Sequence, residues 1–377
     1  MTLPPDPATN FDTSAVGTRV EARVLARVDG ADDVREAAAP ARNAVRRRIV
    51  IGTAAAAVAA AATAVVLGDV PRRDRADAYR YVASVTPPVL RLTPTPQSAG
   101  RTLLDLAAKV EKQPAPHPSE WIYTKTWGWS LNIDADAPLG AATAAVPTVS
   151  EQWINKDGSG RDRSAFGEPL FPHPGTEAAA RERGLVAGTG VTDERYGPGH
   201  YDAPRPVPDD PRALAKLIRT KSSAVEENGR RELLVALAAW AGEGKMGGDS
   251  AQHLSGARRA TMLRVLAEPD RYFDFGPSDA DRDGEGYGPL RTYTTRTWQG
   301  QEALAVVTQQ KPGHDPAHPK HYSRETLLIS PDTGAVMGSE EAIFGDPLKI
   351  NVKQVPATLS VRETLTRQPV RAEGARP

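Results

Sequence analysis

Residues 121–133 read WIYTKTWGWSLNI, and this stretch decides how the main part of the chain folds. Large apolar side chains occupy nearly every second position, and mostly small polar residues occupy the positions between them. Successive side chains of a β-strand point to opposite faces, so this alternation predicts a strand with one apolar face and one polar face.

More strand patterns follow along the chain. Asp157-Gly158 supplies the residues that a tight turn needs, and it joins a strand through Trp153 and Ile154 to a second strand that ends near Phe166. The C-terminal third carries further strand patterns in residues 290–298, 302–309, 322–329, 336–344 and 358–366. These patterns predict an antiparallel meander.

Helical patterns precede and interrupt the strands. Ser98 can cap a helix that Pro114 ends, because serine accepts a hydrogen bond from the first turn and proline cannot continue a helix. A block of three helices starts at Asp210-Pro211 and ends before Pro269. Residues 167–210 show no sustained period, which predicts a long loop or a cover over the sheet.

Residues 49–68, IVIGTAAAAVAAAATAVVLG, carry no charge. Twenty helical residues, at about 1.5 Å each, span the roughly 30 Å of bilayer hydrocarbon, so we expect a transmembrane helix here. Arg46, Arg47 and Arg48 touch its N-terminal edge, and basic residues favour the cytoplasmic side. The N-terminus is therefore expected inside the cell and the main domain outside the cytoplasm.

The same arginines also permit a different export route. Arg46 to Val50 resembles a twin-arginine signal, with an apolar stretch after it and Ala76-Asp77-Ala78 as a small-residue cleavage site. In that interpretation the N-terminal segment is removed and the domain is released. Both interpretations place the bulk of the chain outside the cytoplasm.

Composition limits the partners and the chemistry. The 47 basic residues balance the 47 acidic residues, so no global field favours nucleic acid and we expect no nucleic-acid partner. The absence of cysteine excludes disulfides, thiolate catalysis and cysteine-containing zinc sites. The bilayer is the first expected partner.

The expected fold class is α+β, with an N-terminal transmembrane helix followed by a curved antiparallel sheet with inserted helices. The tail could form one amphipathic helix at Thr13–Val28 that docks a cytoplasmic partner, or it could be a disordered arm. The expected divisions are a cytoplasmic tail at 1–48, the transmembrane helix at 49–68, a proline-rich spacer at 69–97, an extracytoplasmic domain at 98–366 and a flexible C-terminus at 367–377.

An acidic stretch is one candidate metal site. Asp279, Asp281 and Asp283 stand two apart with Gly284 in the sixth place, as at the start of a calcium-binding loop. The twelfth place holds Leu290, where a calcium loop needs a glutamate. A solvated acidic turn is therefore the favoured interpretation.

A histidine-rich stretch is the other candidate. His314, His318 and His321 offer three imidazoles that suit zinc or copper. Pro316 and Pro319 lie between them, so the three cannot line one helix face. A loop between two strands is favoured here, and no metal or other cofactor is expected.

The aromatic strand and the missing motifs bear on function. Trp121, Trp127 and Trp129 could line a face for an apolar ligand, although aromatic stripes at strand spacing more often form a core. The sequence has no GxSxG elbow, HExxH motif, phosphate-binding glycine loop or dinucleotide fingerprint. We therefore expect binding rather than enzymatic activity.

Three motifs carry a family resemblance: WIYT at 121–124, WINKDGSGR at 153–161 and LLISPDTGAVMG at 327–338. With the arginine run and the alanine-rich span before them, the chain resembles an uncharacterised family of actinobacterial single-pass membrane proteins often encoded beside extracytoplasmic-function sigma factors. The resemblance implies an ectodomain like the half-barrel of lipoprotein carriers. It also implies sensing or binding, with lipid among the ligands.

The function we expect is a membrane-anchored extracytoplasmic domain that binds a ligand or protein of the cell envelope, as an accessory of envelope signalling linked to a sigma factor. One alternative is an exported soluble carrier of a hydrophobic molecule, for which a mature N-terminus near Tyr79 would be the sign. The other is a hydrolase, which would need a histidine, a carboxylate and a hydroxyl within hydrogen-bond reach.

Overall fold

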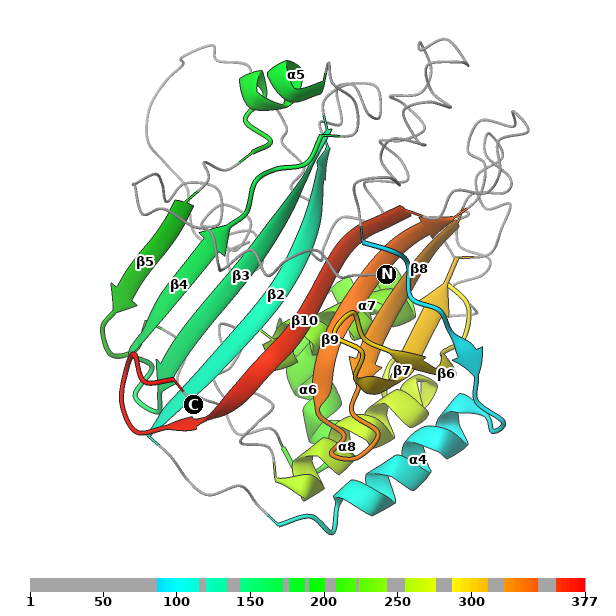
Figure 1. Cartoon of the computed structure of the whole chain (residues 1–377). Helices are drawn as coiled ribbons and strands as arrows, with labels where there is room; N and C mark the ends of the chain where they lie inside the picture. Colours follow the sequence, from blue (N-terminus) through cyan, green and yellow to red (C-terminus); the bar gives the residue numbers. More distant parts are fainter. Residues whose placement is uncertain are drawn as a thin grey trace, which may run out of the picture.

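The protein has an α+β fold built on one antiparallel sheet of ten strands (Figure 1). The computed structural model describes residues 87–114, 120–133, 143–171, 176–186, 190–200, 208–221, 224–242, 255–275, 287–310, 322–344 and 357–376. The strands are β1 (Thr93–Pro94), β2 (Trp121–Ile133), β3 (Thr143–Asn155), β4 (Gly160–Phe166), β5 (Gly190–Tyr196), β6 (Arg291–Arg296), β7 (Glu302–Gln309), β8 (Tyr322–Ile329), β9 (Val336–Phe344) and β10 (Ala357–Val370).

The sheet joins two meanders. Its spatial order is β1-β6-β7-β8-β9-β10-β2-β3-β4-β5, so each meander keeps chain order, and the sheet is open at β1 and β5. β10 pairs with β9 on one side and with β2 on the other, where Val361 lies opposite Trp129. The last strand of the chain thus closes the N-terminal and C-terminal halves into one sheet.

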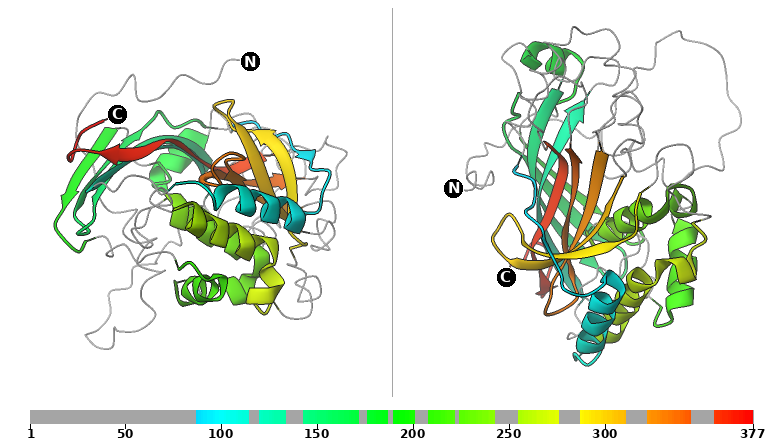
Figure 2. Two further views of the ribbon diagram at one scale, coloured as in Figure 1. Left: turned by 90° about the horizontal axis from the view of Figure 1, so that it is seen from below. Right: turned by 90° about the vertical axis from the view of Figure 1, so that its right-hand side faces the viewer.

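Helices gather on one face of this sheet (Figure 2), which we call the helix face. They are α4 (Ala99–Val110), α5 (Thr176–Glu182), α6 (Pro211–Lys221), α7 (Ala224–Gly242), α8 (Gly256–Ala267) and α9 (Pro269–Tyr272). α7 lies against β8 and β9, whereas α8 packs between α4 and α6. The helix layer is therefore in direct contact with the middle of the sheet.

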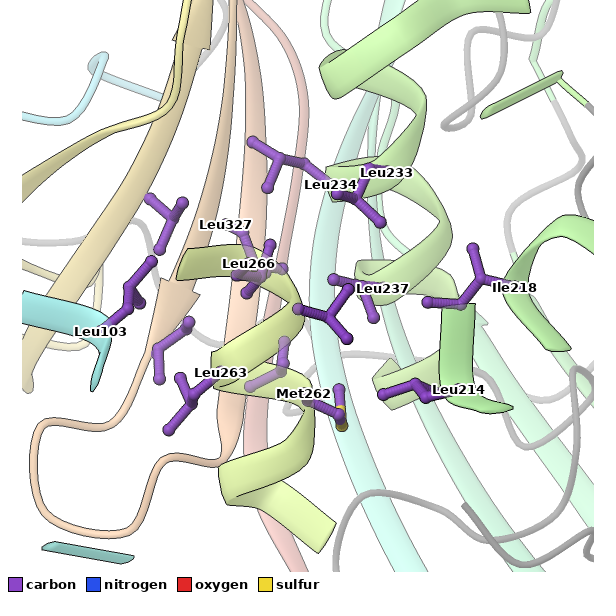
Figure 3. Packing of buried hydrophobic residues seen from close by; sticks show 14 of the residues in the cluster. Leu103, Leu214, Ile218, Leu233, Leu234, Leu237, Met262, Leu263, Leu266 and Leu327 are labelled. Atoms are coloured by element: carbon purple, nitrogen blue, oxygen red, sulfur yellow. The ribbon is translucent and has the colours of Figure 1, made fainter. Parts of the chain in front are cut away.

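The largest hydrophobic core lies between these helices and the sheet (Figure 3). Leu103 of α4, Leu237 of α7, Leu263 of α8 and Leu327 of β8 are each no more than 1% exposed. Gly229, with φ 66°, interrupts α7, and residues 231–238 after it are all buried. A helix that is buried on all sides is a core element, so α7 is fixed to the sheet rather than laid on its surface.

The opposite face has a core of its own, and a segment crosses it (Figure 1). We call residues 87–95 the strap and this side the strap face. Leu90 of the strap packs there with the aromatic residues of β2 and of the β6–β7 turn. The buried members of this second cluster are Leu90, Trp127, Trp129, Leu131, Ala145, Val149, Trp298, Ala303, Ala305, Val307, Leu328, Ile343, Leu359 and Val361.

The structure confirms most of the predicted elements. β2 has the predicted bounds, Ser98 caps α4 through its side chain, and Gly158, at φ 78°, turns the predicted hairpin between β3 and β4. The three predicted helices are α6, α7 and α8, and the predicted C-terminal strands are β6 to β10. β10 extends to Val370 because it pairs with β2 as far as Trp121, well past the end of its pairing with β9.

The prediction of a long irregular excursion at 167–210 is wrong in part, because α5 and β5 lie within it. β5 reads GVTDERY and is a sheet edge, paired only with β4 among the described residues. Edge strands tolerate charge, so its sequence lacks the apolar alternation by which we recognised the other strands. α5 is one short helix of seven residues, too short to show a period.

Several predictions fall outside the residues that the structure describes. These are the tail, the arginine triplet, the transmembrane helix, most of the spacer, the acidic stretch at 279–284 and the histidine-rich stretch at 314–321. Within the described ranges, every helix is too short or too polar to cross a bilayer.

Candidate functional site

Two adjacent pairs of charged residues lie in the middle of the sheet, Arg324-Glu325 on β8 and Glu340-Glu341 on β9. All four are buried. Consecutive strand residues point to opposite faces, so one residue of each pair faces the strap and the other faces the helices. We call this arrangement the charge junction, because it puts buried charge on both faces of the same two strands.

On the strap face, Arg324 forms an ion pair with Glu340, whose side chain is fully buried. Glu340 also accepts a hydrogen bond at 2.7 Å from the backbone N–H of Leu90, and Arg324 donates to the carbonyl oxygen of Leu90 at 3.3 Å. A buried carboxylate is stable only when it is paired and hydrogen-bonded. The strap therefore supplies part of what keeps this ion pair inside the protein.

Neighbouring strands hold the rest of the strap through its backbone carbonyls. Thr358 of β10 donates to the carbonyl oxygen of Pro87 at 2.8 Å, and the indole of Trp298 donates to that of Pro88 at 3.1 Å. Thr295 of β6 donates to the carbonyl oxygen of Arg91 at 2.8 Å. Side chains of β10, of β6 and of the β6–β7 turn thus hold the strap, which leads from the N-terminal region into the domain.

On the helix face, Glu325 and Glu341 stand directly opposite each other on β8 and β9. Arg231, just after the interruption in α7, reaches them with its guanidinium. Its Nη2 lies 3.2 Å from Glu341 Oε1, and its Nε lies 3.8 Å from Glu325 Oε2. Like charges opposite each other destabilise a sheet, so Arg231 is what allows the two carboxyls to be neighbours.

Two carboxyls and one guanidinium cannot all be charged at low cost in a dry site. Burial and the neighbouring Glu341 raise the pKa of Glu325 well above its usual range. Burial also raises the pKa of Glu341, against the opposing effect of Arg231. Since Arg231 is closer to Glu341, we assign the ion pair to Glu341 and the retained proton to Glu325.

Several buried atoms of this cluster have no hydrogen-bond partner among the described residues. They are Arg231 Nε, Glu325 Oε2, Glu341 Oε2 and the Tyr287 hydroxyl. The Arg231 guanidinium lies 5.9 Å from the centre of the Tyr287 ring. Incompletely satisfied buried polar groups are costly, so α7 packs on the sheet here over polar atoms that are not fully hydrogen-bonded.

The tryptophans proposed as a ligand face fall into two groups. Trp127 and Trp129 belong to the strap-face cluster, where Trp127 contacts Trp298 at 6.3 Å between ring centres. Trp121 lies at the other end of β2 and packs in a separate cluster with Tyr123. In the first group the indole N–H of Trp129 is buried without a hydrogen-bond partner among the described residues.

A buried carboxyl accompanies that first group. Glu363 of β10 lies opposite Trp127 and is 1% exposed. Burial raises the pKa of Glu363, and the Thr297 hydroxyl and the backbone N–H groups of Gln299 and Trp298 offset this rise only in part. These donors lie near the carboxylate but do not reach normal hydrogen-bond geometry with either of its oxygens. The aromatic layer therefore contains an acid that burial favours in its neutral form.

A third polar cluster ties the C-terminal end of the chain to the strap face. Glu151 accepts hydrogen bonds from Tyr123 at 2.7 Å, Arg163 at 3.0 Å and Arg376 at 2.6 Å. Burial opposes ionisation of Glu151, but these hydrogen bonds outweigh it and lower the pKa of this carboxyl. This cluster is fully partnered, so we interpret it as structural.

A metal centre or a histidine-based hydrolytic site would need several histidine or acidic side chains close together. Among the described residues there is no group of three or more histidine or acidic side chains placed to hold a metal ion. One histidine, His200, lies in these ranges, and its ring stacks on that of Tyr196 at 3.8 Å.

We did not predict the charge junction from the sequence. Its signal was present, because YSRETLLI and VMGSEEAIF each place two adjacent charges inside an apolar strand. Adjacent residues of a strand face opposite sides of the sheet, so in a strand with one face in water only one of two adjacent charges can be solvated. The other charge must face the interior, and a pair of adjacent charges is therefore the sign of a buried charge.

Comparisons of the chain with protein-family models and with curated proteins, and of its structure with solved structures, found no match.

Proposed function

We propose that this chain is a membrane-anchored extracytoplasmic domain that binds a ligand or protein of the cell envelope and passes the bound state to its N-terminal segment. In this proposal residues 49–68 form the transmembrane helix, Arg46, Arg47 and Arg48 mark its cytoplasmic edge, and the open sheet serves as a half-barrel-like binding domain. The tail would contact a cytoplasmic partner, and the domain would act as an accessory of envelope signalling linked to a sigma factor.

The observation that carries the proposal is the charge junction. The strap is the first described segment after residues 49–68, and Leu90 is bound by Arg324 and Glu340. The next residues of the same strands, Glu325 and Glu341, hold α7 through Arg231. A displacement of α7 relative to the sheet therefore acts on the strands that hold the strap.

Such a relay needs an element with two arrangements that a ligand can bias. We assign this role to the helix side of the junction, where two carboxyls share a guanidinium and several polar atoms have no hydrogen-bond partner among the described residues. A ligand or partner that shifts α7, or that changes the protonation of Glu325, would alter how β8 and β9 hold the strap. The strap would pass this change to the segment before it.

A soluble carrier of a hydrophobic molecule is the second candidate. The apolar cluster under Leu90, which includes Trp127 and Trp298, favours it, because release of the strap would expose a large aromatic face. In that case the N-terminal segment would be a cleaved twin-arginine signal. The strap would then act as the cover of the ligand face.

Protease shaving of intact protoplasts tests the proposal. The chain would carry a C-terminal tag, with the tail detected separately and the chain mass recorded. The proposal predicts loss of the tag, a protected tail and an intact N-terminus. A tag released into the medium on a chain that begins near Tyr79 would contradict it and would support the carrier. A tag protected together with the tail would contradict both.

A further inference from the structure

A buried acid on the strap face lacks the partners that such groups usually have. Glu363 of β10 lies between Trp127 of β2 and Gly338 of β9. It faces the strap, because Val361, two positions earlier on the strand, belongs to the strap-face cluster. Glu363 is 1% exposed, and neither carboxylate oxygen has a hydrogen-bond partner among the described residues. Buried carboxyls are normally paired or hydrogen-bonded, so this one calls for an explanation.

Two other buried acids show what is missing. Glu340 forms an ion pair with Arg324, and Glu151 forms one with Arg376. In the part of the chain that the structure describes, no arginine or lysine donates to Glu363 in this way. An opposite charge beside a carboxyl favours its ionised form. A cation from outside the chain would therefore complete this position.

The rings beside Glu363 suit an organic cation. The ring centre of Trp127 lies 6.3 Å from those of Trp129 and Trp298, and the ring planes are inclined by 69° and 51°. Inclined rings form a corner, and a cation in that corner can lie within about 6 Å of both ring centres. At this distance an indole attracts an alkylammonium group through its π-system.

A second polar group of the same layer has no partner. The indole N–H of Trp129 is buried and meets no acceptor among the described residues. Trp129 lies opposite Val361, two positions before Glu363, so both polar groups face the same layer. An indole can only donate a hydrogen bond. The layer thus offers a carboxylate to a cation and a donor to an oxygen atom.

The acid is covered by the β6–β7 turn and by the strap. The hydroxyl of Thr297 and the backbone N–H of Gln299 lie near its carboxyl. The next side chain of the turn, Trp298, donates to the carbonyl oxygen of Pro88 at 3.1 Å and so joins the turn to the strap. A ligand would reach Glu363 when these two covering segments lift from the sheet.

We propose that Glu363 and the indoles of Trp127, Trp129 and Trp298 form a site for a small organic cation, an alkylammonium group that carries an oxygen atom. The carboxylate pairs with the ammonium group, the rings surround its alkyl groups, and the N–H of Trp129 donates to the oxygen. The cation can be free or part of a lipid headgroup, since the chemistry is shared. The proposal rests on the proposed ligand-binding role of the domain, but not on the anchor or the relay, so protease shaving can fail without affecting it.

The test is isothermal calorimetry of the full chain in non-ionic detergent with two probes of the same shape. Choline carries a quaternary nitrogen, and 3,3-dimethyl-1-butanol has a neutral carbon in its place. We expect choline to bind more tightly by about tenfold or more. Glu363→Gln should abolish this preference by weakening choline alone. Glu302→Gln is the matched control, because Glu302 is exposed and paired with Arg296 at the base of the same turn, and it should leave both affinities unchanged.

A further variant tests the oxygen atom. Trp129→Phe keeps an aromatic ring but removes the N–H, so it should weaken choline by about fivefold and leave tetramethylammonium, which has no oxygen, unchanged. Glu363→Gln removes an acid whose charged form is disfavoured by burial, and it should unfold at the same or a higher temperature than the native chain. Weaker binding by this variant would then reflect the lost carboxylate and not a damaged fold.

Proton release gives a readout on the native chain, should a variant fail to fold. Burial raises the pKa of Glu363, so an incoming cation should displace its proton to the buffer, and the neutral probe should not. Calorimetry near pH 7 in buffers of different ionisation heat measures this release. The other charged groups on this face are the Arg324–Glu340 pair and Lys125, which have contacts of their own.

Glycerophosphocholine, a soluble lipid headgroup, distinguishes the two sources of the cation. Binding as tight as that of choline, and lost in Glu363→Gln, would identify a headgroup, whereas binding of choline alone would identify a free amine. Either result supports the site. The proposal would be overturned if choline did not bind, if it bound no better than its neutral analogue, or if its affinity survived Glu363→Gln.

Discussion

Replacing Arg231 by methionine removes the guanidinium that lies between Glu325 and Glu341. Its nitrogen atoms are 3.8 Å and 3.2 Å from these carboxylates, and all three side chains are at most 5% exposed. Removing one partner of a buried ion pair costs about 3–5 kcal/mol, because it leaves an uncompensated buried charge. We expect a loss of about 4 kcal/mol in the free energy of unfolding near pH 7.

The loss should shrink as the pH falls. Burial raises the pKa of Glu325 and of Glu341, so the folded state keeps protons that the unfolded chain releases above its usual value of 4.5. The contribution of each such group to stability is therefore greatest below that value and falls as the pH rises toward the folded pKa, by about 1.4 kcal/mol per pH unit.

In the native chain Arg231 opposes the rise in the pKa of Glu341, and the Arg231→Met variant lacks this effect. The folded variant therefore holds more protons than the folded native chain, and its deficit should shrink between pH 7 and pH 5. Replacing Glu341 by glutamine in the variant should restore part of the loss near pH 7, because it removes a carboxyl that must otherwise be either charged or protonated in a dry site.

Urea unfolding near pH 5, 6 and 7, followed by the fluorescence of the six tryptophans, measures these differences. Arg271→Met is the control, because its pair with Glu268 is exposed and its removal should cost less than about 1 kcal/mol at every pH. A deficit for Arg231→Met that is the same at pH 5 and pH 7 would mean that Arg231 acts by packing alone, and the reasoning would fail.

Two further predictions concern packing and the C-terminal end. In urea unfolding, Gly256→Ala should destabilise the fold by about 1–3 kcal/mol, because a Cβ there would lie 2.0 Å from the carbonyl oxygen of Val110. Gly197→Ala is the control and should be close to neutral, because a Cβ there meets nothing within 4 Å. Trp153→Phe should lower the free energy of unfolding by about 1 kcal/mol and speed amide hydrogen exchange in residues 371–376, because the indole N–H donates to the carbonyl oxygen of Ala375 at 2.7 Å. Unchanged exchange would show that this hydrogen bond does not hold the C-terminal segment.

The elements that could be predicted are those whose pattern is local. The alternation in β2 and the cap of α4 at Ser98 depend on residues within a few positions of each other, and the structure has both. β5 was missed because an edge strand does not need the alternation of a half-buried one. Sequence pattern thus indicated the fold class but not every element.

The charge junction could not be predicted, because its partners are distant in the chain. Glu325 and Glu341 resemble solvated strand residues until α7 brings Arg231 onto them. Likewise, Glu340 can be a buried carboxylate because it accepts a hydrogen bond from the backbone N–H of Leu90 and forms an ion pair with Arg324. Two adjacent charges inside an apolar strand are the local sign of such a site, but they do not reveal the partner.

Coupling between the two faces of the junction is the central claim, and a double-mutant cycle measures it directly. Arg231→Met perturbs the helix side and Glu340→Gln perturbs the strap side, and amide hydrogen exchange at Leu90 reports the free energy of strap opening in each variant and in the pair. The account predicts an interaction energy above about 0.5 kcal/mol. Effects that add to within roughly 0.3 kcal/mol would show that the strap and α7 are independent, and the relay would be contradicted.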